Sequence, residues 1–359
     1  MRYKTFGTLR LPAIGQGAGG ADGASDAVWI GVLQAGIDLG MTLIDTAEIY
    51  RAGRSEKVVG KAVEGRRDKV FISTKFSPDH CRSQEVKKAL EGSLRRLKTD
   101  HVDLYQIHWP SPSVTLDETV GAMLELKAAG KVRFLGVSNF TVEDMMKARA
   151  LSGDQIVSNQ IEYNLVDRGP EKDLLPYCSQ HGCFLVAYNP LLAGAVRRPL
   201  LKSIAQRHGK TAVQVILRWL AGHDCVIPIP KTLNISHVRD NATAVDFDLD
   251  EQALGEIEEA FAYRVIRAPA RQIRILPSST EVIYTSRREA EENKAGAIPS
   301  PVELADGIRS HGMLKPVRLV PTTDQSGRYL YDLTQGRMRY WAWVIAHGED
   351  SEVPAYVME

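Results

Sequence analysis

Three residue types that can hold or move a proton stand directly after short apolar runs of this sequence. They are a carboxylate, an ammonium and an imidazole, at Asp45, Lys75 and His108, and Tyr50 follows the first of them in a glycine-bearing loop. A phenol with its ordinary pKa of about 10 is a poor acid at neutral pH, but a neighbouring ammonium lowers that pKa. A carboxylate fixes such an ammonium and offsets the cost of burying it. We therefore expect Asp45 to hold Lys75, and Lys75 to lower the pKa of Tyr50.

This group suits the protonation of an oxyanion as a hydride reaches the attached carbon, with His108 donating a hydrogen bond to the same oxygen. Each residue taken alone also has a simpler interpretation. A histidine at a strand end is more often structural, a lysine or aspartate there is often solvated, and Tyr50 could be an aromatic residue packed on a surface loop.

The same pattern continues along the chain, which favours one shared site. Ser138-Asn139, Gln160 and Tyr188 end three further apolar segments, so that six successive segments end in hydrogen-bonding groups. In a parallel barrel, side chains at the carboxyl ends of the strands face the active site. We therefore expect these side chains to converge at one end of the fold.

Strand-like and helix-like segments alternate up to about residue 262, and this order predicts a parallel sheet. Eight strands separated by amphipathic runs predict a closed (β/α)8 TIM barrel, and the residues before the first helix could form a hairpin across its lower mouth. An open, doubly wound sheet is the alternative, because periodicity does not decide closure. The expected strands are LPAIGQG at the start and then 43–46, 70–74, 102–108, 132–137, 156–161, 184–188 and 226–229.

A change in polarity after residue 271 predicts a second, small α/β domain. Ser300 and Glu303 form a capping box around Pro301, which predicts a helix that ends at Gly312. We expect a barrel at 1–262, a linker at 263–270 and the small domain at 271–359. Its further elements are expected to be strands in SSTEVIYTS, PVRLV and RYLYDL and a helix in GRMRYWAWVIAHG.

The composition is that of a soluble globular protein, and its cysteines favour the cytoplasm. Of the 359 residues, 44% are hydrophobic and 25% charged, and the formal net charge of +1 gives no reason to expect nucleic acid or a membrane as a partner. The start has no long apolar segment that would predict a signal peptide or a membrane span. The four cysteines lack CxxC spacing, so we expect reduced thiols and no metal site.

These residues carry a resemblance to the aldo-keto reductases over about residues 1–262. LIDTAEIYRAGRSEKVVG is similar to that family's DTA-x-x-Y-G-x-G-x-SE-x-x-G segment, with Arg51 where glycine is usual, and STKF, DLYQIHWP, GKVRFLGVSNF, NQIEYN and YNPL follow further family patterns. The resemblance implies that Tyr50 is the proton donor and that Asp45, Lys75 and His108 complete a catalytic tetrad. It implies that the nicotinamide ring stacks on Tyr188. It also implies cofactor contacts from Ser138, Asn139, Gln160, Asn189, Pro190, Leu191 and Ile229.

IPIPKTLNISHVRDNA resembles the segment with which this family binds the 2′-phosphate of NADPH. Lys231, Thr232 and Asn241 match that segment, whereas His237 stands where many members carry an arginine, with Arg239 close by. A lysine beside a hydroxyl group suits a phosphate, so NADPH is the expected cofactor and the use of NADH stays open. GQGAGG is weak evidence for a phosphate cradle, and a solvated, charged helix start explains His237 and Arg239 equally well.

Residues 273–357 resemble the N-terminal nucleotide-binding fold of ParB-like and sulfiredoxin-like proteins. ELADGIRSHGMLKPVRLVP is similar to their helix-loop-strand signature, and Gly336 and Arg339 match their G-E-R-R-x-R-A motif, from which Arg337, Met338 and Trp341 depart. A nucleotide is therefore one expected partner of this domain, and an ordinary helix start packed on a small core is the alternative. DNA binding and sulfiredoxin chemistry are not expected, because no helix-turn-helix follows and the catalytic cysteine is missing. A regulatory, docking or substrate-gating role is the remaining hypothesis.

The leading hypothesis is an NADPH-dependent oxidoreductase that converts an aldehyde or ketone to an alcohol, or the reverse, on a small-molecule substrate. A non-catalytic sensor or partner-binding subunit is the alternative, although such a subunit has no need of the whole tetrad. Trp109, Tyr163 and the loop LLAGAVRRPL are expected to line or border the pocket, and Trp109 could equally be a packing residue at the rim. Neither the particular substrate nor the oligomeric state follows from the sequence.

Overall fold

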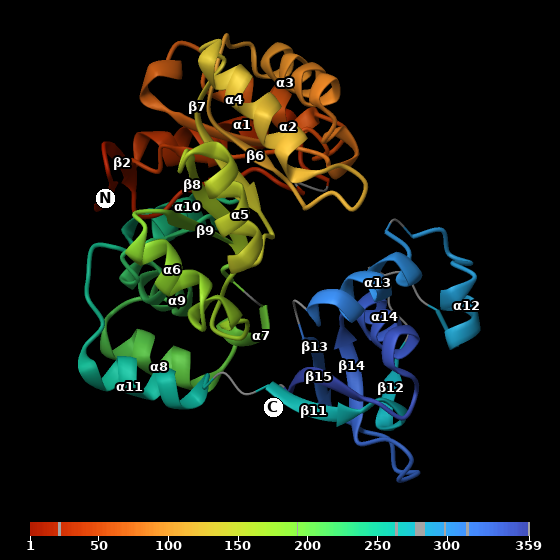
Figure 1. Cartoon of the computed structure of the whole chain (residues 1–359). Helices are drawn as coiled ribbons and strands as arrows, with labels where there is room; N and C mark the ends of the chain where they lie inside the picture. Colours follow the sequence, from red (N-terminus) through yellow and green to blue (C-terminus); the bar gives the residue numbers. More distant parts are fainter. Residues whose placement is uncertain are drawn as a thin grey trace. The chain divides into compact units, whose positions relative to one another are not determined.

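The chain forms two compact units, Met1–Ala262 and Tyr263–Glu359, each of which we describe by itself (Figure 1). No helix of the residues that the structure describes is long and apolar enough to cross a membrane. The structure is a computed structural model, and it describes residues 1–20, 23–191, 193–262, 265–276, 284–297, 299–313 and 316–357.

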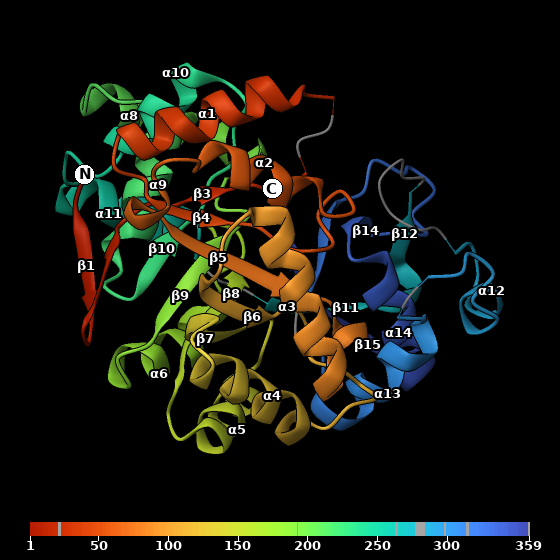
Figure 2. The same ribbon diagram turned by 90° about the horizontal axis from the view of Figure 1, so that it is seen from above.

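The first unit is a parallel eight-stranded sheet in the order β10-β9-β8-β7-β6-β5-β4-β3, with helices around it (Figure 2). Each predicted strand from 43–46 onward matches one of these strands to within two residues at either end. The strands are β3 (Gln16–Gly17), β4 (Leu43–Asp45), β5 (Phe71–Phe76), β6 (Val102–Ile107), β7 (Val132–Ser138), β8 (Ile156–Glu162), β9 (Phe184–Tyr188) and β10 (Val226–Pro228).

Two backbone hydrogen bonds close this sheet into a barrel. The amide of Gly15 donates to the carbonyl of Pro228 at 3.0 Å, and the amide of Gly17 donates to that of Pro230 at 3.2 Å. A Cβ on Gly17 would lie 2.9 Å from the carbonyl oxygen of Ile229, so the close approach of the two edges requires glycine there. The predicted closed barrel is confirmed, and the open sheet is wrong.

Several helices of this unit begin at capping residues. Ser25, Thr141 and Asp250 each accept a hydrogen bond from a first-turn amide, and Thr211 forms a capping box with Gln214. The helices are α1 (Asp26–Asp38), α2 (Arg54–Ala62), α3 (Ser83–Leu97), α4 (Leu116–Ala128), α5 (Val142–Ser152), α6 (Leu174–Gln180), α7 (Ala193–Val196), α8 (Pro199–Arg207), α9 (Ala212–Gly222), α10 (Ile235–Thr243) and α11 (Glu251–Ala260), with short 3₁₀ turns at Arg67–Lys69, Pro78–His80 and Gly169–Glu171.

A hairpin of β1 (Tyr3–Phe6) and β2 (Leu9–Pro12) covers the amino-terminal end of the barrel. Its Leu9 and Leu11 are buried in one cluster with residues from the beginnings of the barrel strands. The ring of Phe6 lies 5.0 Å from that of Phe184, the first residue of β9. The predicted hairpin is therefore present, and the opposite, carboxyl-terminal end of the strands is left for a site.

The second unit is a five-stranded sheet in the order β11-β15-β13-β14-β12 with its own apolar core. The predicted capping box of Ser300 and Glu303 is confirmed at the start of α13. The strands are β11 (Val265–Pro269), β12 (Ile273–Ile275), β13 (Val317–Pro321), β14 (Tyr331–Gln335) and β15 (Glu352–Val357), and the helices are α12 (Arg287–Glu291), α13 (Pro301–His311) and α14 (Arg337–His347), with a 3₁₀ turn at Ala270–Gln272.

The segment 263–270, which we expected to be a linker, contains strand β11. This strand pairs antiparallel with β15 over its whole length. Ala268 is buried and Ile266 half-buried, whereas Val265 and Arg267 are exposed, which is the alternation of a strand with one face on a core. The expected strand in SSTEVIYTS falls largely on 277–283, outside the described residues.

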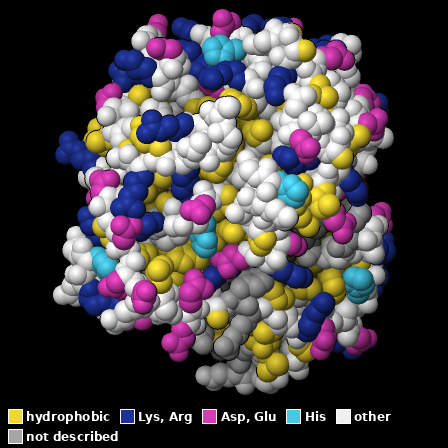
Figure 3. All heavy atoms as spheres, turned by 60° about the vertical axis from the view of Figure 1, so that its left-hand side comes forward, with side chains coloured by type: hydrophobic (Ala, Val, Ile, Leu, Met, Phe, Trp, Pro, Cys, Tyr) yellow, Lys and Arg dark blue, Asp and Glu magenta, His cyan; other side chains and the backbone are white. Residues whose placement is uncertain are grey.

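Charged side chains of both signs are interspersed with apolar ones on the face of the molecule that Figure 3 shows. This mixture agrees with the formal net charge of +1. On that face it provides no extended field of one sign to attract a polyanion.

Candidate active site

Consecutive strands of the barrel carry the predicted site residues at their carboxyl ends. Asp45 ends β4, Lys75 lies near the end of β5, and His108 directly follows β6. Ser138 ends β7 and Asn139 follows it, Gln160 lies near the end of β8, and Tyr188 ends β9. Because all these strands are parallel and closed into a ring, the side chains lie at the same mouth of the barrel.

A buried ion pair between Lys75 and Asp45 forms the centre of this site. Lys75 Nζ lies 2.7 Å from each carboxylate oxygen of Asp45 and 2.8 Å from the carbonyl oxygen of Thr46. The Lys75 side chain has no exposed surface, and that of Asp45 is 3% exposed. Burial alone lowers the pKa of Lys75, but the charge of Asp45 and the phenol of Tyr50 raise it, and the balance lies above its ordinary value. Lys75 is therefore an ammonium at neutral pH.

Two further donors complete the surroundings of the Asp45 carboxylate. Ser73 Oγ donates to Oδ1 at 3.1 Å, and Gln160 Nε2 donates to the same oxygen at 2.7 Å. Ser73 was not among the predicted site residues, although its position two residues before Lys75 on one strand places both on the same face. Gln160 was predicted to hold a cofactor, but its bond to Asp45, which spans 115 positions of the chain, was not predicted.

Tyr50 lies in the β4–α2 loop beside Lys75 and His108. Lys75 Nζ is 5.0 Å from the centre of the Tyr50 ring, and the rings of Tyr50 and His108 meet edge to face at 5.5 Å. A Cβ on Gly19 would lie 3.2 Å from the phenol ring, so glycine at position 19 lets the β3–α1 loop pass close to it.

The pKa of Tyr50 is shifted in the direction opposite to the one that we expected. Burial raises this pKa above its ordinary value, and the opposing effect of the Lys75 charge is smaller. The predicted net lowering is therefore wrong in this structure, because the sequence does not reveal how deeply the phenol is buried. Tyr50 is consequently protonated at neutral pH, the form in which a phenol can donate a proton.

His108 is neutral at neutral pH. Burial and the nearby charge of Lys75 lower its pKa to about 3. A neutral imidazole still has one N–H to donate, so it can hydrogen-bond an oxygen without adding a second positive charge. Its Nδ1 atom is buried and has no hydrogen-bond partner within the part of the chain that the structure describes.

A second hydrogen-bond network joins the ends of β7, β8 and β9. Asn139, in the left-handed conformation at φ 62°, donates from Nδ2 to the carbonyl of His108 and to Ser138 Oγ, both at 3.0 Å. Tyr188 donates its hydroxyl hydrogen to Asn139 Oδ1 at 2.9 Å, and Ser138 Oγ donates to the carbonyl of Gln160 at 3.0 Å. The predicted nicotinamide contacts therefore form one connected set that also includes the backbone of His108.

Of the residues expected to bind the cofactor phosphate, Lys231 and Thr232 lie just before α10, and Asn241 lies near the end of that helix. Lys231 Nζ donates to the carbonyl of Gly20, and Thr232 Oγ1 is 3.5 Å from His237 Nδ1. Asn234 accepts a bond from the amide of Ser236 and so begins the helix. A lysine, a hydroxyl and the amino-terminal end of a helix are a donor set that suits a phosphate.

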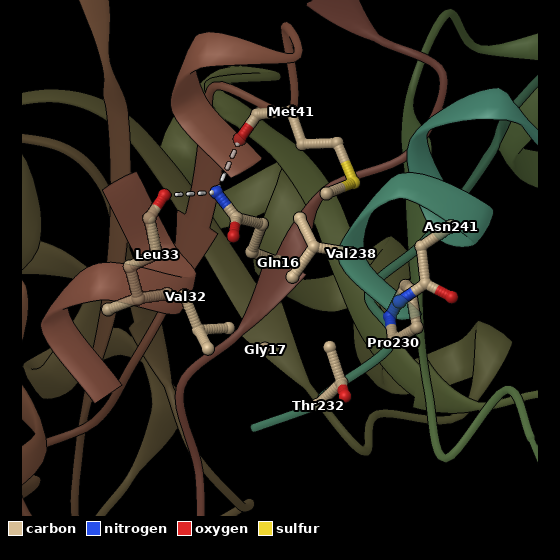
Figure 4. Close-up of a pocket in the computed structure, with 9 residues that line it drawn as sticks. All are labelled: Gln16, Gly17, Val32, Leu33, Met41, Pro230, Thr232, Val238 and Asn241. Carbon is tan, nitrogen blue, oxygen red and sulfur yellow. Dashed lines mark hydrogen bonds between the residues drawn. The ribbon is translucent and has the colours of Figure 1, made fainter. Parts of the chain in front are cut away.

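A small pocket extends from this helix start toward α1, as Figure 4 shows. Its polar side chains include Thr232, Asn241 and Gln16, and Gln16 Nε2 is tied to the carbonyls of Leu33 and Met41 at 3.2 and 2.8 Å. Gln16 therefore ties β3 to α1 and to the segment between α1 and β4. Arg239 is exposed on α10.

Two predicted pocket residues differ in their surroundings. Trp109 is 48% exposed in the loop after β6, as a rim residue is expected to be. Tyr163 is fully buried, and its hydroxyl lies 2.7 Å from Glu171 and 2.9 Å from His223. Tyr163 therefore packs in the core and does not border an open pocket.

The profile of the Aldo/keto reductase family matches residues 13–262. The chain belongs to this family. Methylglyoxal reductase YeaE of Escherichia coli is 44% identical over 264 residues, which cover 71% of this chain and 93% of that protein. Glyoxal reductase of Bacillus subtilis is 34% identical over 63% of this chain and 81% of its own length.

Solved structures of aldo-keto reductases superimpose on the barrel. One from Klebsiella pneumoniae in complex with NADPH has a TM-score of 0.69 and 39% identity, over 73% of this chain and 96% of that one. A second, from the same organism in complex with NADP and acetate, has a TM-score of 0.69 and 38% identity, over 72% and 95%. As an aldo-keto reductase, this chain is an NADPH-dependent oxidoreductase that acts on carbonyl groups.

Removal of Lys75 from this aldo-keto reductase tests the central ion pair. We expect Lys75→Met to lower the free energy of unfolding by about 3–5 kcal/mol, because it leaves the Asp45 carboxylate buried without its counter-charge. The double variant D45N/K75M is expected to recover much of this loss, since it buries no charge. Urea unfolding followed by tryptophan fluorescence measures both. A double variant no more stable than K75M alone would contradict this account.

The low pKa of His108 makes the stability of the barrel depend on pH. An unfolded histidine has a pKa of about 6.5, so between about pH 6 and pH 4 the unfolded state binds a proton that folded His108 does not. Stability that is present above this window is therefore lost as the pH falls through it. In His108→Gln we expect the slope of unfolding free energy against pH to be smaller than in the wild type by up to about 1.4 kcal/mol per pH unit. Parallel slopes in urea unfolding would show that His108 is not neutral in the fold.

Proposed function

We propose that this chain reduces small α-oxoaldehydes of the methylglyoxal type with NADPH, and that Tyr50 gives the proton. The observation that carries the proposal is the phenol of Tyr50 beside a buried ammonium, with its ring centre 5.0 Å from Lys75 Nζ. The similarity to methylglyoxal reductase YeaE, at 44% identity, supports this substrate class. A location in the cytoplasm belongs to the same proposal, because all four cysteines are free and buried.

In this proposal each member of the tetrad has a separate task. NADPH, when bound, supplies a hydride to the carbonyl carbon of the substrate. Tyr50 transfers its phenolic proton to the carbonyl oxygen, and the ammonium of Lys75 stabilises the phenolate that remains. Asp45 keeps Lys75 charged, and neutral His108 donates a hydrogen bond to the same oxygen and so orients it.

The cofactor contacts are proposed for the residues that the family resemblance implied. Gln160 uses its amide nitrogen on Asp45, which leaves its oxygen as an acceptor for the carboxamide. Lys231, Thr232 and Asn241 would hold the 2′-phosphate, with Arg239 nearby. The other proposed contacts are Ser138, Asn139, Tyr188, Asn189, Pro190, Leu191 and Ile229.

Replacement of Tyr50 tests the proposed proton donor. We expect Tyr50→Phe to lower kcat for methylglyoxal by about 100- to 10,000-fold, because the proton has no other positioned source. The dissociation constant for NADPH should stay nearly the same, since the ring that packs against Gly19 and His108 is kept. Loss of NADPH absorbance measures turnover, and quenching of protein fluorescence measures cofactor binding.

Tyr163→Phe is the matched control for this substitution. It removes a buried phenol that bonds Glu171 and His223 away from the proposed chemistry, so it should lower stability and leave turnover within a few-fold of the wild type. Full turnover in Y50F would rule out the proposed donor.

For the second unit we propose a ParB- or sulfiredoxin-like fold and a regulatory or substrate-gating role. The helix-loop-strand order of α13 and β13 and the glycine that opens α14 support this fold. Gly336 has φ 94°, and Arg339 donates to the carbonyl of Pro316 at 2.9 Å. A nucleotide at this unit stays a prediction. Arg337 is buried and donates a hydrogen bond to the carbonyl of Leu276 at 3.1 Å, and a phosphate would have to compete with this bond.

A chain shortened to end at Ala262 tests the regulatory role. The Klebsiella pneumoniae enzyme corresponds over 96% of its length to the barrel region, which supports independent folding of this part. If the second unit acts on the barrel, removing it should change kcat or KM for methylglyoxal, or the dissociation constant for NADPH, by about 5-fold or more. Equal constants and equal oligomeric state in both proteins would eliminate the role.

A further inference from the structure

The loop that carries Tyr50 stays bonded to β5 beyond Asp45, the last residue of β4. The amide of Glu48 donates a hydrogen bond to the carbonyl of Lys75 at 3.1 Å. The chain then turns, and the amide of Tyr50 donates back to the carbonyl of Ala47 at 3.1 Å. Glu48 therefore lies where the loop leaves β5, two residues before the proposed proton donor.

The side chain of Glu48 extends the pairing with β5 by a further hydrogen bond. At the start of β5 the amide of Phe71 donates to the carbonyl of Thr42 at 2.9 Å, and in the same parallel register the amide of Ser77 faces residue 48. The Glu48 carboxylate accepts the hydrogen bond of this amide at 2.7 Å. A side-chain oxygen thus takes the place that a main-chain carbonyl has earlier in the ladder, and the main chain can turn away toward Tyr50.

A second donor to Glu48 comes from the 3₁₀ turn that follows β5. His80 Nδ1 lies 2.7 Å from the same carboxylate oxygen, Oε1. Because a carboxylate only accepts hydrogen bonds, His80 carries a hydrogen on Nδ1 and donates it. The Glu48 side chain is 9% exposed, so its two bonds offset the cost of removing a carboxylate from water. Glu48 therefore joins the β4–α2 loop to the β5–α3 loop.

The hydrogen bonds of Glu48 reach residues 75, 77 and 80, and so hold the Tyr50 loop against the strand that carries Lys75. Proton transfer requires the phenol at a fixed place beside the ammonium, and a displacement of about 1 Å can lower a rate about 100-fold. We propose that Glu48 is a positioning residue that keeps Tyr50 beside Lys75 through its bonds to Ser77 and His80. This inference rests on the proposed function, because it requires Tyr50 to be the proton donor.

Glu48→Ala removes both side-chain bonds and leaves the tetrad itself unchanged. We expect its kcat for methylglyoxal to fall about 10- to 100-fold, because the loop can then shift Tyr50 away from Lys75. KM and the dissociation constant for NADPH should stay within about 3-fold of the wild type, since the interaction acts on the chemical step. The solvent deuterium isotope effect on kcat should rise, because the transfer of the proton becomes slower. Loss of NADPH absorbance in H₂O and in D₂O measures these quantities on the full chain.

Three further variants make the outcome specific. Glu48→Gln keeps the shape and an oxygen that can accept from Ser77 and His80, so it should recover most of the lost kcat. Glu85→Ala makes the same change at an exposed carboxylate that pairs with Lys88 on α3, and it should leave kcat at the wild-type value. His80→Ala removes one donor from a side chain that is 43% exposed, and it should lower kcat by less than Glu48→Ala does.

Several results would overturn the inference. Glu48→Ala with the kcat and isotope effect of the wild type would show that Glu48 does not position Tyr50, and so would Glu48→Gln that is as slow as Glu48→Ala. A lower kcat with an unchanged isotope effect and a matching fraction of unfolded protein would show a structural role alone. If Glu48→Ala does not fold, a wild-type kcat in His80→Ala overturns the inference. Full turnover in Tyr50→Phe would instead contradict the proposed function itself, so the two failures are distinguishable.

Discussion

A buried ammonium and carboxylate, Lys75 and Asp45, form the interaction on which the rest of the site depends. Removing two charges from water is costly, and only close geometry with further hydrogen bonds repays that cost. Here Lys75 Nζ reaches both oxygens of Asp45 at 2.7 Å and a backbone carbonyl at 2.8 Å, while Ser73 and Gln160 donate to the carboxylate. The pair is thus held by a shell of partners from two strands, β5 and β8, and from the loop after β4, which fixes the position of a full positive charge beside Tyr50.

The closed barrel makes this shell possible, because its register places the partners in neighbouring positions. Asp45 on β4 pairs with Ser73 on β5, and Ser138 on β7 pairs with Gln160 on β8. Closure in turn depends on the approach of β3 to β10, for which Gly17 has no room for a side chain. A glycine at one edge of the sheet therefore helps to bring a carboxylate and an amide 115 positions apart into contact.

The sequence predicted where the site residues lie better than it predicted how they behave. An apolar run that ends in a polar residue is a local pattern, so the convergence of Asp45, Lys75 and His108 could be expected from the strand ends. The capping box of Ser300 was predictable for the same reason, since all its parts lie within four residues. The direction in which the pKa of Tyr50 is shifted was not predictable, because the burial of this phenol depends on side chains from the whole barrel mouth. Strand β11 was also missed, since only its pairing with β15 identifies it.

The positive charge of Lys75 lowers the pKa of both groups beside it, whereas burial shifts their pKa values in opposite directions, and this supports the tasks proposed for them. The ammonium of Lys75 disfavours a proton on the imidazole of His108 and favours its loss from the phenol of Tyr50. His108 therefore has no proton to give up as an acid and can act only through a neutral N–H bond. Tyr50 stays protonated because burial outweighs the ammonium, yet the same ammonium stabilises the phenolate once the proton has left. Groups whose pKa values are driven apart by their surroundings take distinct roles, and here burial, which lowers the pKa of His108 and raises that of Tyr50, supports the proposed division between a hydrogen-bond donor and a proton donor.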